Sequence, residues 1–157
     1  MLNTPFSPWP CFSEEEAEAV TRVLLSNKVN YWTGSECREF ENEFADWCRA
    51  EYAVALANGT LALDLALKVL GICPGDEVVV TPRTYLASAS CVATAGAIPI
   101  FAEVNAKTQN ITAESIRAVL TPRTKVVICV HLAGWPCEME SIMTLAGDHG
   151  LYVVEDC

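Results

Sequence analysis

Apolar residues in the stretch 52–157 follow two patterns, short continuous runs and longer stretches with a helical period. The short runs are typical of strands buried on both faces, and they lie at 53–57, 77–80, 98–102, 125–130 and 151–155. The helical stretches lie between them, at 60–70, 84–95, 113–120 and 138–149. Because strands separated by helices pair in parallel, the sequence predicts an α/β fold, with a mostly parallel sheet covered by helices on both faces.

The first 50 residues have a different pattern, and we expect them to form an N-terminal arm and helices. Residues 1–12 are rich in proline, which predicts an extended arm. Ser13 followed by Glu16 is a capping box, so a helix is expected to begin there and to end near Asn27.

A second helix is predicted after a loop at 29–34. Ser35 is expected to cap this helix, whose apolar stripe consists of Cys37, Phe40, Phe44 and Trp47. Residues 51–157 would then form the first part of a larger domain. The loop carries two aromatic residues of the exposed type, Tyr31 and Trp32.

Composition limits the classes of function. The chain has 157 residues, of which 52% are hydrophobic and 19% charged, as expected for a packed globular protein. A formal net charge of −10 argues against nucleic acid or an anionic membrane surface as the partner. No apolar run approaches the roughly 18 residues of a membrane span, and no signal peptide is visible at the N-terminus.

The eight cysteines show no metal-binding spacing. None forms a C-x-x-C pair, and no histidine stands at zinc-finger spacing, so no metal is expected. Most lie in apolar segments, where small core residues are common, and we interpret them as reduced thiols of a cytoplasmic protein.

The turn at Asn58-Gly59-Thr60 joins a predicted strand to a predicted helix. A helix N-terminus presents free N–H groups and a positive dipole end, which favour a phosphate. The same pattern also occurs in ordinary strand-to-helix turns, and spacing alone favours that reading. The G-x-G-x-x-G and P-loop motifs of nucleotide sites are absent.

Asp156 ends a hydrophobic strand, at the edge where open α/β sheets bind ligands. A strand ending in Glu-Asp also occurs in Mg²⁺-dependent ATPases, but the missing P-loop counts against that class. A phosphate cradle and an isolated acid suit pyridoxal phosphate, whose ring nitrogen takes an aspartate partner. Glu155 should point to the opposite face, because strand side chains alternate.

Two further residues follow predicted strands. Tyr85 is ordinarily a core or surface residue, but at this position its ring suits contact with a planar ligand. His131 precedes Gly134 and is more often a satisfied rim residue than a catalytic one, yet it is a candidate for ligand or substrate contact.

From about Phe6 to Cys157 the chain resembles the N-terminal part of the DegT/DnrJ/EryC1/StrS family of sugar aminotransferases. The resemblance rests on an ordered series of motifs: YWTG at 31–34, NGTLAL at 58–63, PGDEV at 74–78, TYLAS at 84–88, GAIPIF at 96–101, TPRTK at 121–125, VHLAG at 130–134 and HGLYVVED at 149–156. Each motif is weak alone, but their order is specific.

The resemblance implies the large domain of a fold type I pyridoxal-phosphate enzyme, here truncated. It implies that the cofactor phosphate is held by Gly59, Thr60 and Leu61. Tyr85 takes the place of the aromatic residue that stacks on the ring, and Asp156 that of the pyridinium partner. The sugar-nucleotide pocket would lie near Tyr31, Trp32 and Gly34.

The family transfers an amino group, usually from glutamate, to a nucleotide-linked keto-sugar, and it works as a homodimer. Its Schiff-base lysine lies beyond Cys157, and none of the lysines here matches it: Lys28, Lys68, Lys107 and Lys125. We therefore expect a fragment that is inactive and poorly stable alone. The alternatives are a dehydratase of the same family, with histidine in place of that lysine, and a catalytically inert fragment.

Overall fold

The computed structural model describes residues 8–157, which divide into two compact units, one up to Ala55 and the other from Leu56 to Cys157. The first unit holds two helices, α1 (Glu14–Leu25) and α2 (Glu36–Cys48). None of the helices in the described part of the chain is long and apolar enough to cross a membrane.

The two helices of the first unit begin differently. The Ser13 hydroxyl accepts a hydrogen bond from the Glu16 backbone N–H at 3.2 Å, and the Glu16 carboxylate accepts from the Ser13 N–H at 2.7 Å. The predicted capping box of α1 is therefore confirmed. The cap predicted for α2 is wrong, because Ser35 has helical backbone angles (φ −114°, ψ −22°) and its side chain makes no cap hydrogen bond.

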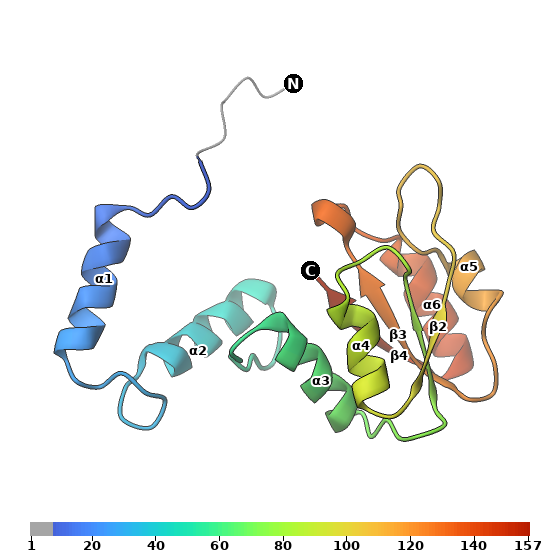
Figure 1. Ribbon diagram of the computed structural model, residues 1–157, viewed down its shortest axis with the longest axis horizontal. Helices are drawn as coiled ribbons and strands as arrows, with labels where there is room; N and C mark the ends of the chain where they lie inside the picture. Colours follow the sequence, from blue (N-terminus) through green and yellow to red (C-terminus); the bar gives the residue numbers. More distant parts are fainter. Residues whose placement is uncertain (1–7) are drawn as a thin grey trace. The chain divides into compact units, whose positions relative to one another are not determined.

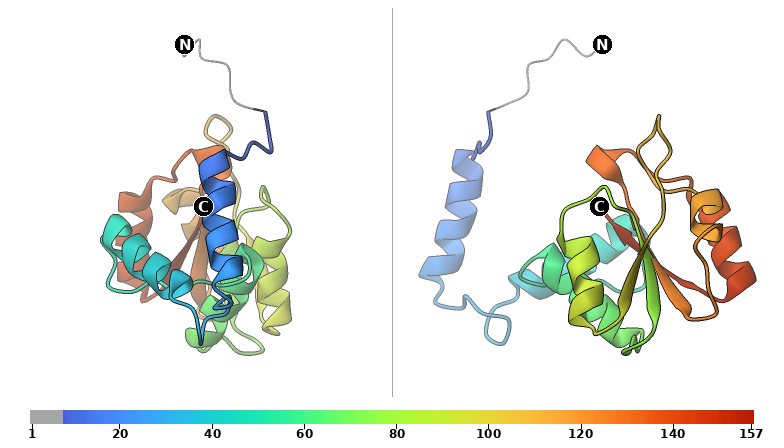
Figure 2. Two further views of the ribbon diagram at one scale, coloured as in Figure 1. Left: turned by 90° about the vertical axis from the view of Figure 1, so that its left-hand side faces the viewer. Right: turned by 45° about the vertical axis from the view of Figure 1, so that its right-hand side comes forward.

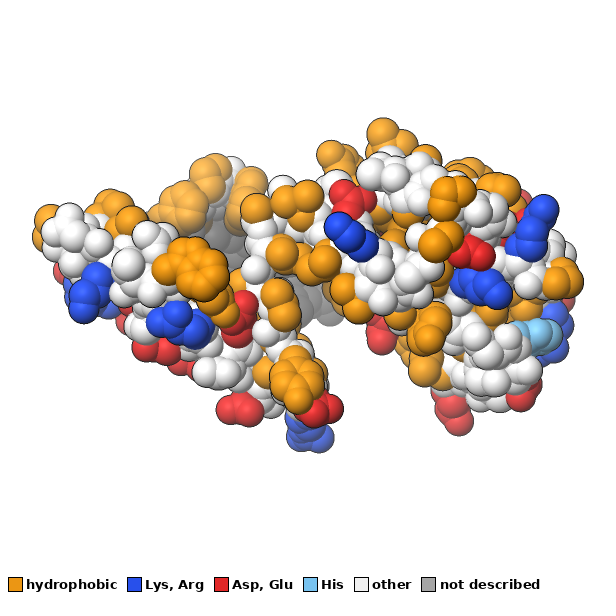
Figure 3. Space-filling view, turned by 90° about the horizontal axis from the view of Figure 1, so that it is seen from below, with side chains coloured by type: hydrophobic (Ala, Val, Ile, Leu, Met, Phe, Trp, Pro, Cys, Tyr) orange, Lys and Arg blue, Asp and Glu red, His pale blue; other side chains and the backbone are white. Residues whose placement is uncertain are grey.

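The apolar stripe of α2 is largely exposed within its unit. Phe40 stacks on Phe44 with ring centroids 5.5 Å apart, and Trp47 follows at 5.9 Å from Phe44. Ala45 is the one residue of α2 that is buried. Figure 3 shows hydrophobic side chains exposed among charged ones on the face that it views.

The second unit is a four-stranded sheet with helices on both faces (Figures 1 and 2). All described pairs of adjacent strands are parallel, in the order β2-β1-β3-β4. Along the chain the elements are α3 (Gly59–Val69), β1 (Glu77–Val80), α4 (Ala87–Thr94), β2 (Ile98–Phe101), α5 (Ala113–Arg117), β3 (Thr124–Val130), the short 3₁₀ helix η1 (Leu132–Gly134), α6 (Met139–His149) and β4 (Tyr152–Asp156).

Alternation along the strands divides the core into two layers. One layer joins α3 and α4 to the sheet face that carries Val126 and Ile128. The other joins α5 and α6 to the face that carries Val127 and Cys129. Five central strand positions in these layers are at most 1% exposed: Val79, Val126, Val127, Ile128 and Cys129. Such burial is expected for parallel strands that are covered on both sides. The predicted fold class is confirmed.

The strand predicted at 53–57 is wrong, because this segment has no regular structure. A strand needs a hydrogen-bonded neighbour, and none of the described strands pairs with it. Its apolar side chains Val54 and Leu56 are exposed. Two helices are also shorter than predicted: α4 begins at Ala87 rather than 84, and α5 ends at Arg117 rather than 120.

The cysteines are less buried than the sequence predicted. Cys91, Cys129 and Cys137 are buried, whereas the other five are exposed. Burial raises the pKa of Cys91 to about 11 and that of Cys129 to about 12. These two thiols are therefore neutral at physiological pH and act as small core residues.

Glu77 is a buried carboxylate at the amino end of β1, and its side chain fastens the loop before β3. It accepts hydrogen bonds from the Thr121 hydroxyl and from Nε of Arg123, the latter at 2.9 Å. The Thr121 hydrogen bond, together with Arg123, holds the pKa of Glu77 below its usual range, although burial opposes this shift. This carboxylate thus ties β1 to the start of β3 at the edge remote from Asp156.

Stability should depend on pH through Glu77. Its folded-state pKa is lowered, so its contribution is complete above the unfolded pKa of about 4.3 and is lost as the pH falls through the folded value. We expect Glu77→Gln to lower the urea midpoint at pH 7 and to flatten its decline between about pH 5 and pH 3. The exposed Glu103→Gln is the control. Equal pH dependence in Glu77→Gln and the parent would contradict this role.

Candidate cofactor site at the carboxyl edge of the sheet

The carboxyl ends of the four parallel strands meet at one edge of the sheet. Short connections lead from the C-terminal ends of α3 and α4 to the starts of β1 and β2, so both helices run away from this edge. Their N-termini therefore lie at the carboxyl edge, on the face of the sheet that they cover. Asp156 ends β4 at the same edge, and alternation from the packed residue Val154 places its side chain on the same face.

The N-terminus of α3 offers two free N–H groups and a hydroxyl. The Asn58 side chain caps this helix by accepting the Leu61 N–H at 3.0 Å. The backbone N–H groups of Gly59 and Thr60 donate no hydrogen bond within residues 8–157, and both residues are exposed. The structure therefore leaves Gly59 and Thr60 available to an anion, while the N–H of Leu61 already has a partner.

Gly59 is not required by the packing of the chain itself. Apart from its chain neighbours and its own helix backbone, a Cβ placed on it meets no heavy atom of the described residues within 4 Å, and its φ lies outside the left-handed region. A glycine at this position is consistent with a ligand that approaches the backbone closely.

Asp156 is held by a hydroxyl group of α4. The Ser88 Oγ lies 2.6 Å from Asp156 Oδ2 and 2.8 Å from the Thr84 Oγ1. Ser88 is completely buried and Asp156 is half-buried. The carboxylate is thus fixed on one oxygen at the edge of the sheet.

Tyr85 lies in the loop between β1 and α4 and is 79% exposed. The loop follows the carboxyl end of β1, and Tyr85 stands three residues before Ser88. Its ring is therefore available at the same edge as Asp156 and the N-terminus of α3. The exposed ring fits the predicted role of covering a planar ligand, which stays a prediction.

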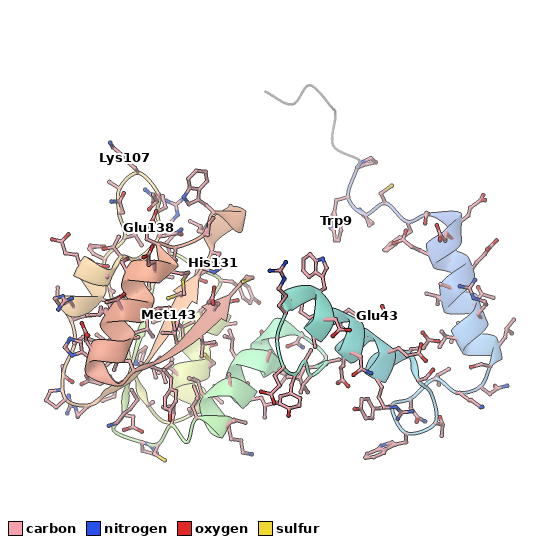
Figure 4. The ribbon with its side chains drawn as sticks, turned by 180° about the vertical axis from the view of Figure 1, so that it is seen from behind. Trp9, Glu43, Lys107, His131, Glu138 and Met143 are labelled. Atoms are coloured by element: carbon pink, nitrogen blue, oxygen red, sulfur yellow. The ribbon has the colours of Figure 1, made fainter. Side chains whose placement is uncertain are left out.

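His131, which is labelled in Figure 4, belongs to a separate polar group with Glu155 and Cys137. Its Nε2 lies 2.8 Å from Glu155 Oε2, and its Nδ1 accepts the Cys137 backbone N–H at 3.1 Å. Nδ1 therefore carries no proton, and Nε2–H donates to Glu155. As alternation requires, Glu155 and Asp156 point to opposite faces. The structure thus does not bring the His131 ring together with Asp156.

The candidate residues Tyr31, Trp32 and Gly34 lie in the first unit. The Tyr31 hydroxyl donates to Glu41 at 3.1 Å, and the Arg38 guanidinium lies 5.5 Å from the Tyr31 ring centroid. Trp32 is 87% exposed. The packing of the loop itself requires glycine at position 34, because a Cβ there would lie 2.3 Å from the Lys28 carbonyl oxygen.

Sequence reasoning missed three contacts of the site: the Ser88–Asp156 bond, the Thr84–Ser88 bond and the Asn58 cap. The composition of α4 carried a signal, since its small residues allow another element to approach closely. The capping preference of asparagine was a signal for Asn58. The partnership between Ser88 and Asp156 joins residues 68 positions apart, which no local pattern encodes.

The site fits a ligand with an anion at one end and a basic nitrogen at the other. Free N–H groups at a helix N-terminus suit a phosphate, and an oriented carboxylate suits a protonated ring nitrogen. Both lie at one edge and on one face of the sheet. Pyridoxal phosphate has this chemistry.

Comparison with known proteins identifies relatives of the chain. Among curated proteins, the chain is 42% identical over 147 residues to the spore coat polysaccharide biosynthesis protein SpsC of Bacillus subtilis. It is 41% identical over 152 residues to GDP-perosamine synthase of Escherichia coli O157:H7. Each match covers 94% of this chain but only 37% and 40% of the relative, so the chain spans about two fifths of their length.

Solved structures agree with these relatives. An aminotransferase from Psychrobacter cryohalolentis is 64% identical with a TM-score of 0.95, covering 98% of this chain and 39% of that one. NtdA from Bacillus subtilis, solved with the bound cofactor PMP, is 31% identical with a TM-score of 0.85, covering 92% of this chain and 34% of that one. The profile of a single family matches residues 10–157, and the chain belongs to that family, the DegT/DnrJ/EryC1/StrS aminotransferases.

Proposed function

We propose that this chain forms the cofactor-binding part of a pyridoxal-phosphate-dependent aminotransferase that acts on a nucleotide-linked keto-sugar. One observation carries the proposal: Asp156 and the free N–H groups of Gly59 and Thr60 occupy the same edge and face of the sheet. The cofactor-bound state of NtdA supports pyridoxal phosphate as the cofactor.

Each residue has a distinct task in this proposal. The N–H groups of Gly59 and Thr60, with the Thr60 hydroxyl, bind the phosphate. Tyr85 covers one face of the ring and excludes water from it. Asp156 lies against the ring nitrogen and keeps a proton on it. When bound, the cofactor supplies a ring that withdraws electrons as a proton leaves the carbon next to the amino group.

The names of relatives support the substrate class. GDP-perosamine synthase and a dTDP-3-amino-3,6-dideoxy-alpha-D-galactopyranose transaminase are both named for nucleotide-linked amino sugars. We infer a substrate of the same class, with glutamate as the amino donor, and a cytoplasmic homodimer. Tyr31, Trp32 and Gly34 are proposed to lie near the sugar nucleotide. For His131 the geometry favours holding the turn before α6 over contact with the ring.

A direct assay tests this function. The full polypeptide encoded by the gene that contains these residues is loaded with pyridoxal phosphate and given L-glutamate and a nucleotide-linked keto-sugar. We expect 2-oxoglutarate and an amino sugar in equal amounts. Loss of a sugar hydroxyl without amino transfer would favour the dehydratase alternative. Absence of both reactions, with no cofactor bound, would contradict the proposal.

Gly59→Ala should separate binding from stability. The added methyl group meets no other side chain or loop of the described residues within 4 Å, so we expect the urea midpoint to stay the same or to rise slightly, since alanine favours helices over glycine by up to about 1 kcal/mol. The affinity for pyridoxamine phosphate should fall about tenfold or more, because a methyl group on Gly59 would crowd a phosphate that approaches the backbone closely. Calorimetric titration measures the affinity, and Gly147→Ala in α6 is the control. Unchanged affinity in Gly59→Ala would contradict the phosphate site.

Asp156→Asn should reduce amino transfer strongly. An amide cannot keep the ring nitrogen protonated, and a loss on the order of 100-fold in kcat corresponds to roughly 2.7 kcal/mol. Affinity for inorganic phosphate at the α3 N-terminus should change little. The exposed Asp148→Asn, which removes the same charge from α6, is the control. Equal rates for Asp156→Asn and the parent enzyme would refute the role of Asp156.

A further inference from the structure

Two hydroxyl groups form a one-way chain of hydrogen bonds that ends on Asp156. A carboxylate only accepts, so the 2.6 Å contact uses the Ser88 proton. Ser88 then has no proton left for Thr84, and the 2.8 Å contact between the two hydroxyls must be donated by Thr84. The direction of both hydrogen bonds is thus fixed by chemistry, from Thr84 to Ser88 to Asp156.

The chain of hydroxyls leaves one oxygen of Asp156 available. Oδ2 accepts from Ser88, whereas Oδ1 accepts no hydrogen bond from residues 8–157. A bond to one oxygen fixes the rotation of the carboxylate about its side-chain torsion, and therefore fixes where the other oxygen points. Charge-assisted bonds of this kind are short and strong, which fits the 2.6 Å separation.

The surroundings of Ser88 make it a rigid support. It is 0% exposed in the first turn of α4, next to the packed core residues Ala87 and Cys91. Its backbone N–H donates to the Tyr85 carbonyl at 3.2 Å, so its position is set by the helix and by the loop that carries Tyr85. The positive end of the α4 dipole also favours an anion beside this turn.

We propose that Ser88, oriented by Thr84, is a positioning residue that holds Asp156 through Oδ2 and thereby presents Oδ1 to the ring nitrogen of bound pyridoxal phosphate. This inference rests on the proposed function. A positioning role for Ser88 differs from a packing role, because the effect of replacing Ser88 then depends on a nitrogen in the ligand and on a carboxylate at residue 156.

A binding cycle with two ligands tests the proposal on the full polypeptide encoded by the gene. The probes are pyridoxamine phosphate and its 1-deaza analogue, in which a C–H group replaces the ring nitrogen. We expect Ser88→Ala to weaken binding of pyridoxamine phosphate about tenfold, as for loss of a hydrogen bond to a charged group. Affinity for the 1-deaza analogue should stay within about twofold.

Three variants sharpen the cycle. Ser88→Thr keeps the hydroxyl and should restore affinity, and Thr84→Val should show a smaller loss than Ser88→Ala. In the Asp156→Asn background, Ser88→Ala should cause no further loss. The matched control is Ser90→Ala in the same helix, whose hydroxyl bonds to the Ala87 carbonyl rather than to Asp156.

The pH dependence of the bound ring nitrogen gives a second readout. Nuclear magnetic resonance of ¹⁵N-labelled pyridoxamine phosphate reports its protonation, and Ser88→Ala should move that titration to lower pH by about one unit. Equal weakening of both ligands by Ser88→Ala, or no weakening of either, would overturn the role of Ser88. A parent protein that binds both ligands equally would instead refute the proposed partner of Asp156, and with it the inference.

Discussion

The parallel pairing of β4 with β3 is the constraint on which the site depends. Register places Asp156 opposite Val130, and the His131 N–H donates to the Asp156 carbonyl at 3.0 Å. Because side chains alternate along a strand, a shift of one residue would exchange Glu155 and Asp156 between the two faces. The register of β4 on β3 therefore decides which carboxylate faces the candidate cofactor site and which one pairs with His131.

Two carboxylates at opposite edges of this sheet have different roles, one in the fold and one at the candidate site. Glu77 at the amino edge is saturated with donors, including the guanidinium of Arg123, and it fastens one strand to the next. Asp156 at the carboxyl edge has one side-chain donor among residues 8–157, Ser88, which leaves its second carboxylate oxygen without a partner there. A carboxylate stabilises the fold when both of its oxygens accept hydrogen bonds from the protein. A carboxylate with one oxygen left over can accept a hydrogen bond from a ligand.

Much of the second unit could be predicted from the sequence, because buried parallel strands and the helices between them leave strong periodic patterns. The four strands at 77–80, 98–101, 124–130 and 152–156 and their helices correspond to predicted elements within a few residues. The segment 53–57 had the same apolar pattern but no described neighbour to pair with, and pairing is not visible in a single segment. The predicted cap at Ser35 was wrong because the residue type alone does not fix the backbone angles that a cap hydrogen bond needs.

The location of Asp156 on β4 has a consequence for dynamics. Asp156 is the last residue of β4, and it is held in place by the pairing of β4 with β3. Local opening of a strand costs less free energy than global unfolding, and it exposes the amide hydrogens of that strand to exchange. A ligand that binds Asp156 would stabilise the paired state of β4, so occupancy of the site and slow amide exchange in β4 are thermodynamically linked.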